Sequence, residues 1–293
     1  MAENSISYSQ FSIYLQCPRK WELEYVHDRR EFEQSIHTIF GTAMHETLQN
    51  YLHVTYNQSA KKADELSLSS DLQSRLVTLY GDAAKQIGHF STPQELQEFW
   101  KDGVEIVNYF KRKRSIYFPT KQHELVGIEV ELKIPLKNNI FFKGFIDILI
   151  KDNRTGRYKI LDFKTSTRGW NKYQKADKNK TAQLILYKEF YARQLGIDPE
   201  LIDVEYIILR RKISEDSDFP MKRIQTFSPA SGKPSRNKIG QLLVEFISTG
   251  FNEDGTHNKD VEYPAYKSSA CKFCKYKDNE ELCPAAKRIA SGI

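Results

Sequence analysis

The sequence predicts an α/β or α+β fold, in which several helices precede a mostly antiparallel sheet that one helix crosses. Apolar side chains recur at helical spacing within residues 7–113, and the pattern then changes to strict alternation over three segments. One further helical stretch separates these segments from a fourth alternating segment. Hydrophobic residues make up 40% of the 293 residues and aromatic residues 12%, so the chain can bury a sizeable core.

The first part of the chain is expected to be helical. Residues 7–27 predict a helix with a kink or a new first turn at Pro18. Three more helices are expected at 41–56, 71–88 and 93–113, the last of which opens with a capping residue followed by proline.

The middle of the chain is expected to form the sheet. Alternation predicts strands at 124–134, 139–151 and 157–165, with turns at Asn138-Asn139 and at 153–156. A helix at 178–195 and a strand at 202–211 follow. The remainder is expected to hold an irregular stretch with Pro220, Pro229 and Pro234, a helix at 235–249 and a tail with three cysteines. We expect a single domain, 1–293, made of a helical part (1–120), a core (121–212) and a C-terminal part (213–293).

Composition excludes several classes of protein. No uncharged apolar run approaches the roughly 20 residues that a membrane-spanning helix needs, so no membrane association is expected. The first residues are charged throughout and lack the apolar region of a secretory signal. Four cysteines are too few for a disulfide scaffold of this length. We therefore expect a globular protein of the cytoplasm.

Positive charge is concentrated in one segment. The window 151–180 carries a net charge of +7, whereas the whole chain carries +6. Such a concentration is typical of a nucleic-acid site, although a solvated lysine-rich loop is an equal alternative. The basic run at 111–114 has a simpler explanation, because cations stabilise the C-terminal end of a helix.

Two neighbouring expected strands carry acidic residues. Asp162 and Lys164 point to the same side of their strand, and Asp147 on the preceding strand can converge on Asp162 if the two strands pair. Two carboxylates so close repel each other, and a divalent cation such as Mg²⁺ or Mn²⁺ would resolve the conflict. The alternative is an ordinary solvent-facing ion pair of Asp162 with Lys164.

Two helices offer further candidates. His45 follows small residues at the start of the helix expected at 41–56 and could supply a nitrogen ligand, with Glu46 as the second candidate. The alternative for His45 is a satisfied core residue. Gln183 and Tyr187 lie one turn apart on the helix expected at 178–195 and could contact DNA or the acidic pair. Their alternative is a polar exposed face.

The four cysteines lie at the two ends of the chain. Cys271, Cys274 and Cys283 follow a C-x2-C-x8-C pattern, and Cys17 precedes them by about 250 residues. C-x2-C is a chelating spacing, and four thiolates complete a zinc or iron–sulfur site. Either site would join the N-terminal helix to the C-terminus, and its loss would unfold the ends.

Taken together, these motifs resemble the PD-(D/E)XK nuclease superfamily, in particular its RecB-like branch with a four-cysteine iron–sulfur cluster. That branch includes the nuclease modules of AddB-type helicase–nucleases and the nucleases of CRISPR adaptation. The resemblance covers most of the chain, and phages encode stand-alone members of this size, for which the location would be the host cytoplasm. The motifs, in the order of that family, are a Cys-Pro helix at 14–20, Gly41-x3-His45, Gly144-x2-Asp147, Asp162-x-Lys164, Gln183-x3-Tyr187 and Cys271-x2-Cys274-x8-Cys283.

The resemblance implies a restriction-endonuclease-like fold, a mixed central sheet flanked by helices. It implies that His45, Asp147, Asp162 and the carbonyl of Phe163 bind Mg²⁺ or Mn²⁺, and that Lys164 positions or activates water. Glu129 is a weaker candidate for a water-mediated contact. It also implies a [4Fe–4S] cluster at the four cysteines, with Zn²⁺ as the alternative. The DNA-binding residues implied or adjoining the site are Gln183, Tyr187, Lys172, Lys175, Lys178 and Lys180.

The function expected from these motifs is metal-dependent hydrolysis of DNA, most simply by an exonuclease that processes ends in recombination, repair or replication. An accessory that binds DNA ends without cutting them, as part of a helicase or integrase complex, is the main alternative. A zinc-containing RNA-binding protein is a third, which leaves the acidic pair unexplained. No G-x4-G-K-[ST] motif occurs, so any ATP-driven unwinding would come from a helicase or recombination partner.

Overall fold

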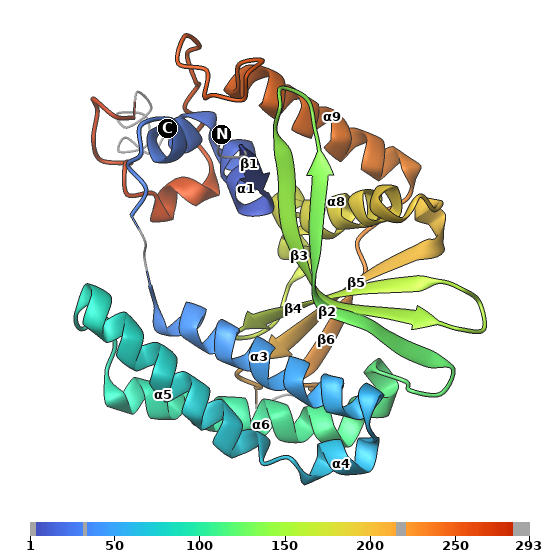
Figure 1. Ribbon diagram of the computed structural model, residues 1–293. Coiled ribbons are helices and arrows are strands. Elements are labelled where there is room, and N and C mark those ends of the chain that lie inside the picture. The colour runs from blue at the N-terminus through green and yellow to red at the C-terminus, as the bar shows by residue number, and fades with distance from the viewer. Residues whose placement is uncertain (1–3, 32–33, 215–220, 284–293) are drawn as a thin grey trace.

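The computed structural model describes residues 4–31, 34–214 and 221–283, and these form a six-stranded mixed sheet with helices on both faces (Figure 1). The elements are β1 (Ser5–Ser7), α1 (Tyr8–Gln16), α2 (Pro18–Trp21), α3 (Ile36–Asn57), α4 (Ala60–Glu65), α5 (Leu68–Ile87), α6 (Pro93–Tyr117), β2 (His123–Pro135), β3 (Phe141–Asp152), β4 (Tyr158–Ser166), α7 (Lys172–Ala176), α8 (Lys178–Leu195), β5 (Ile202–Arg210), β6 (Ile224–Phe227) and α9 (Lys233–Gly250). A π-helical turn at Glu22–Val26 and 3₁₀ turns at Pro199–Leu201 and Ser269–Phe273 complete them.

The long β2–β3 hairpin is the frame of the sheet. Its strands pair antiparallel from His123↔Asp152 to Pro135↔Phe141. Asn138 and Asn139 take the connecting turn with φ of 56° and 52°, in the left-handed region that asparagine tolerates better than most residues. The turn expected from these two asparagines is therefore confirmed.

The sheet is mixed, as the resemblance implied, and three of its five strand pairs in the described chain are antiparallel. β1 pairs with β3 in parallel, and β4 pairs with β5 in parallel along the whole of both strands. Helix α8 connects β4 to β5, because parallel neighbours need a crossover rather than a hairpin. The sheet order is β1-β3-β4-β5-β6, with β2 on the other edge of β3.

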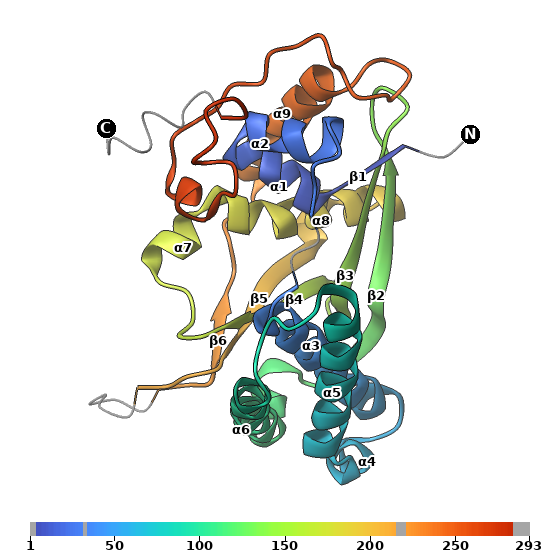
Figure 2. The same cartoon turned by 90° about the vertical axis from the view of Figure 1, so that its left-hand side faces the viewer.

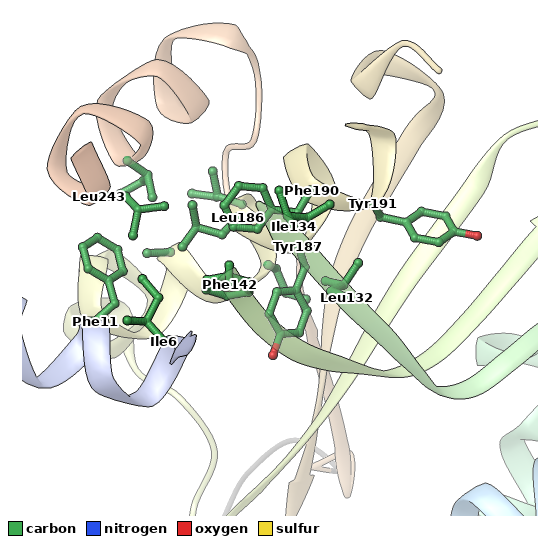
Figure 3. Close-up of a cluster of buried hydrophobic side chains, with 14 of the residues drawn as sticks. Ile6, Phe11, Leu132, Ile134, Phe142, Leu186, Tyr187, Phe190, Tyr191 and Leu243 are labelled. Carbon is green, nitrogen blue, oxygen red and sulfur yellow. The ribbon is translucent and has the colours of Figure 1, made fainter. Parts of the chain in front are cut away.

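Each face of the sheet is covered by its own set of helices. Helices α1, α8 and α9 lie on one face, and α3, α5 and α6 lie on the other (Figures 1 and 2). The first face buries a cluster around Phe11, Phe142 and Leu186, part of which Figure 3 shows. The second buries Leu161 and Phe163 of β4 against the helical part of the chain. Asp162 lies between these two residues and therefore faces the α8 side.

Element boundaries agree closely where the pattern was strongly periodic. Helix α8 has the expected bounds, and α9 contains the expected helix at 235–249. Helix α6 continues past the basic run at 111–114 and ends at Tyr117. It ends there because Pro119 disfavours helical backbone at Phe118, the residue before it. The short elements β1, α4, α7 and β6 were not expected, and β6 lies inside the stretch expected to be irregular. Pro220 of that stretch lies outside the described residues.

The N-terminal helices α1 and α2 lie beside the C-terminal part of the described chain (Figure 2). The Arg19 guanidinium donates to the carbonyl of Leu282 at 2.9 Å, and the Lys275 ammonium donates to the carbonyl of Arg29 at 2.9 Å. Trp21 is fully buried against Phe246 and Tyr263 from the C-terminal part. Within the described ranges, no helix has the length and apolar character required to cross a membrane.

Candidate active site

The candidate site forms where β3 and β4 separate. The antiparallel ladder between them ends at Ile148↔Leu161, so the next position places Asp147 opposite Asp162. In place of a further ladder bond, the backbone N–H of Phe163 donates to Oδ2 of Asp147 at 2.8 Å. The two acidic side chains therefore occupy the fork between the strands, as the sequence pattern suggested.

Strand β3 changes the direction in which its side chains face at the same point. Ile146 packs in the α8-side cluster and Ile148 in the α3-side cluster, although residues two apart in a regular strand share a face. Glu129 lies opposite Asp147 on β2, between the pairs Ile128↔Ile148 and Val130↔Ile146, and has a φ of 49°. Three acidic residues on adjacent strands thus reach the same level of the sheet.

Asp162 and Lys164 form the buried ion pair of the site. Asp162 is 2% exposed, and the Nζ of Lys164 lies 2.6 Å from its Oδ2. Apart from this ion pair, Oδ2 has no hydrogen-bond partner among the described residues. Burial alone would lower the pKa of Lys164, but the charges of Asp162 and Asp147 outweigh it and raise that pKa above the ordinary value.

The surroundings of Asp147 disfavour its charged form, whereas those of Lys164 favour the charged form. Burial, and after it the charge of Asp162, hold the pKa of Asp147 well above its ordinary value. The hydrogen bond from the Phe163 N–H and the charge of Lys164 act in the other direction and are weaker. The ionised forms of Asp147 and Asp162 therefore repel each other, and additional positive charge at the site would stabilise the pair.

His45 reaches the site from α3. Its Nδ1 lies 3.4 Å from Oδ2 of Asp147, and its ring meets the Phe163 ring edge-on at 5.7 Å. Burial lowers the pKa of His45 to about 4, so the imidazole is neutral near pH 7 and has a lone pair to donate. The neighbouring Glu46 instead binds the guanidinium of Arg75 on α5, at 2.5 Å.

Gln49, one turn after His45, was not singled out from the sequence. Its amide donates to Oε1 of Glu129 at 2.6 Å and to the backbone carbonyl of Asp147 at 3.3 Å. Gln49 is buried. The spacing His45-x3-Gln49 places both side chains on one face of the helix and is the signal that could have found it.

Gln183 and Tyr187 reach the site from α8. The Gln183 amide donates to the Tyr187 hydroxyl at 3.3 Å, and that hydroxyl lies about 3.0 Å from the position that a Cβ on Gly144 would take. The absence of a side chain at Gly144 therefore allows the tyrosine to approach β3. Figure 3 shows the Tyr187 hydroxyl pointing away from the apolar cluster that surrounds its ring.

The donor set suits a hard divalent cation. Asp162 offers a buried oxygen without a hydrogen-bond partner among the described residues, and Asp147 offers a second carboxylate whose negative charge is disfavoured. Carboxylate and carbonyl oxygens with one imidazole suit Mg²⁺ or Mn²⁺. In the described part of the chain, however, no three His, Cys, Asp or Glu side chains are arranged closely enough to hold a metal ion as they stand.

The expected DNA-binding lysines follow β4, on α7 and at the start of α8. Lys172 and Lys178 are exposed, and Lys175 and Lys180 are partly exposed. Lys175 lies over the ring of Phe227 at 5.7 Å, and Lys180 lies over the ring of Trp170 at 5.4 Å. These residues form a basic margin beside the strands that carry Asp162 and Lys164.

The four cysteines line one small cavity. Cys17, Cys271, Cys274 and Cys283 surround a space of about 30 Å³ and are not joined by disulfides. They are not arranged as a closed metal site in the described chain, so the structure does not show the expected cysteine cluster. Burial raises the pKa of Cys274, and nearby Cys17 and Cys271 add to that effect, whereas Lys20 opposes it.

Comparison with known proteins identifies the family of the chain and agrees with its fold. A family model of the PD-(D/E)XK nuclease superfamily matches residues 5–283, and the chain belongs to this superfamily. Among solved structures, it is similar to the crystal structure of a "Putative exonuclease" from Eubacterium rectale, with a TM-score of 0.52 and 14% sequence identity over 93% of this chain and 86% of the other. That likeness shows a shared fold. No curated protein gave a significant match.

Proposed function

We propose that the protein is a metal-dependent deoxyribonuclease that removes nucleotides from DNA ends. Membership of the nuclease superfamily supports the general class. The observation that carries the proposal is the pair of carboxylates at the fork of β3 and β4, with Lys164 beside them. An ordinary structural ion pair would not need the second carboxylate.

Each residue of the site has a role in this proposal. Asp147 and Asp162, with His45 and the carbonyl of Phe163, would hold Mg²⁺ or Mn²⁺. When bound, the cation would stabilise negative charge on the phosphoryl oxygens and lower the pKa of water. Lys164 would leave its ion pair with Asp162 to position the attacking water and to neutralise charge on the phosphate. Gln183 and Tyr187 would hold the DNA strand from the α8 side.

DNA would be held mainly through its phosphates. The lysines that follow β4 give a basic margin next to the site, which supports salt-sensitive binding with little sequence preference. The resemblance to RecB-like nucleases supports three further parts of this proposal: the enzyme acts at DNA ends, in the cytoplasm, and beside a helicase or recombination partner. The same resemblance supports the proposal that a phage encodes the protein.

We further propose that the four cysteines bind a [4Fe–4S] cluster, with Zn²⁺ as the alternative. The convergence of all four thiols on one cavity supports a four-thiolate site. Such a site would join Cys17, at the end of α1, to the C-terminal tail. Its role would be structural, because it lies apart from the acidic residues.

A non-catalytic, DNA-end-binding accessory is the second candidate. Two observations favour it: Lys164 closes the acidic pair, and the described side chains form no ready metal cage. A nuclease would have to open this ion pair when a cation binds, whereas an accessory would keep it closed.

The test uses protein purified without oxygen and single- and double-stranded DNA labelled at the 5′ or 3′ end. We expect cleavage with Mg²⁺ or Mn²⁺, none with EDTA, and a loss of at least about 100-fold in Asp162→Asn, which keeps the shape of the side chain. Asp82→Asn, on the exposed face of α5, is the matched control and should cleave normally. Tight DNA binding without cleavage in either metal would establish the accessory instead.

A further inference from the structure

A second cavity lies away from the acidic residues, where β6, α8 and α9 meet. It has a volume of about 210 Å³, and its floor is apolar, formed by residues such as Phe227, Ile185 and Pro229. Lys175, Lys178 and Lys238 stand at its margin. In Figure 2 the chain that leaves β6 rises past α7 toward α8 and α9, which brings these three segments together.

The lysines of this cavity leave positive charge uncompensated. Within the described ranges, no carboxylate forms an ion pair with Lys175, Lys178 or Lys238. Lys178 of α8 and Lys238 of α9 line the same cavity, and both are exposed. The charge of Lys238 lowers the pKa of Lys178. A like-charged pair at a cavity margin is stabilised by an anion that lies between the two groups.

One buried aromatic ring, that of Tyr206, separates this cavity from the candidate active site. The Nζ of Lys164 lies 5.8 Å from the centre of the Tyr206 ring. That ring stacks on Phe227 with centroids 6.4 Å apart and an angle of 10° between the planes. Phe227 in turn lines the cavity. A single strand that passes over the surface outside Tyr206 would need only a few nucleotides to reach from the candidate active site to the cavity.

We propose that this cavity binds the single strand of DNA a few nucleotides from the bond that is cut, with a phosphate between Lys178 and Lys238 and the adjoining base or sugar against Phe227. The proposal rests on the proposed function and extends it. The phosphate fits the unpaired lysines, and the partly exposed aromatic ring fits the face of a base. A duplex end would reach this cavity only after its strands had separated, so the site favours unpaired ends.

The test measures binding rather than cleavage. Fluorescence anisotropy with a labelled 12-nucleotide single strand, in EDTA, compares the protein with Lys178→Gln, Lys238→Gln and the double variant. We expect each change to weaken binding about two- to fivefold and to lower the slope of log affinity against log salt by about one. Lys61→Gln, on the exposed α4, is the matched control and should bind like the unchanged protein.

A second arm separates a DNA strand from a free nucleotide. Deoxynucleoside monophosphate and inorganic phosphate are added as competitors at millimolar concentration. If Lys178→Gln and Lys238→Gln bind the strand with unchanged affinity and salt slope, the proposal is wrong. It is also wrong if the variants bind the strand normally and only competition by the mononucleotide is lost. Because no step requires cleavage, weaker binding in these variants would support the cavity even if the unchanged protein failed to cut DNA.

Discussion

Gln49 connects two of the three acidic residues through a single amide. It donates to Glu129, whose backbone has left-handed φ, and to the backbone of Asp147 at the point where β3 changes facing. Backbone in this region costs about 1–3 kcal/mol for a residue other than glycine and is kept where its surroundings enforce it. We therefore interpret Gln49 as the residue that holds the strained side of the site in place.

Replacing Gln49 with methionine tests this role. Gln49→Met keeps the length of the side chain and removes both hydrogen bonds, so the carboxylate of Glu129 would lose a buried partner. We expect Mn²⁺ affinity, measured by titration calorimetry, to fall about 10- to 100-fold while the protein stays folded. Gln94→Met, at the exposed start of α6, is the control. Unchanged Mn²⁺ affinity in Gln49→Met would remove Gln49 from the site.

The close approach of Tyr187 to β3 leaves little room for a side chain at position 144. A Cβ there would lie 3.0 Å from the Tyr187 hydroxyl and 3.2 Å from the Phe142 ring. Gly144→Ala should therefore displace the tyrosine by a few tenths of an ångström, lower the free energy of unfolding by about 1 kcal/mol and reduce cleavage at least tenfold. Denaturant unfolding and the end-labelled assay measure the two effects. Normal cleavage in a destabilised variant would show that the position of Tyr187 does not matter for catalysis.

At the scale of elements, two glycines in neighbouring helices should respond in opposite ways to alanine. Gly81 lies inside α5 with no described atom within 4 Å of an added Cβ, so Gly81→Ala should raise the free energy of unfolding by up to about 1 kcal/mol. Gly103, in α6, would place a Cβ 2.5 Å from Leu72 and 3.1 Å from Phe40. Crowding costs about 1–3 kcal/mol and should outweigh the helix preference. Urea unfolding of both variants checks the signs, and equal effects would contradict this packing.

The elements that the sequence predicted well are those with a local cause. Helix α8 has a capping Asp177 before it and Gly196 after it, and its bounds match the expectation. Strand β1 has three residues, and nothing in Ser5–Ser7 distinguishes them from the helix that follows. They form a strand because β3 offers a free edge beyond the end of β4, which is a property of the assembled sheet.

The same distinction applies to the site. Asp147, Asp162 and Lys164 could be predicted because strand alternation and one hairpin place them together. Glu129 was only a weaker candidate and Gln49 was not singled out, because their contact depends on how α3 lies across β2 and on a φ of 49° that no local pattern indicates. The cavity of Lys178 and Lys238 likewise joins residues 60 positions apart, from helices whose approach is decided by packing.

At the scale of the whole molecule, the ends of the chain are held together by contacts that do not involve the cysteines. Arg19 binds the carbonyl of Leu282, and Trp21 packs against Tyr263. These contacts bring Cys17 to the cavity that the three C-terminal cysteines line. The cluster would therefore strengthen an existing contact between the ends, and its loss should loosen the ends before it unfolds the sheet.

Cys283→Ser tests this order of events. In protein purified without oxygen, we expect the variant to lose most of its iron and sulfide, or its zinc, and to melt at a lower temperature. Hydrogen exchange should increase first in α1, α2 and the tail, while β3 and β4 stay protected, because their core does not include the cysteines. Gln16→Leu, which lines the same cavity without a thiol, is the control and should keep its metal. Equal metal content in Cys283→Ser and the unchanged protein would exclude a four-thiolate site, and the ratio of iron to zinc in the unchanged protein would identify the metal.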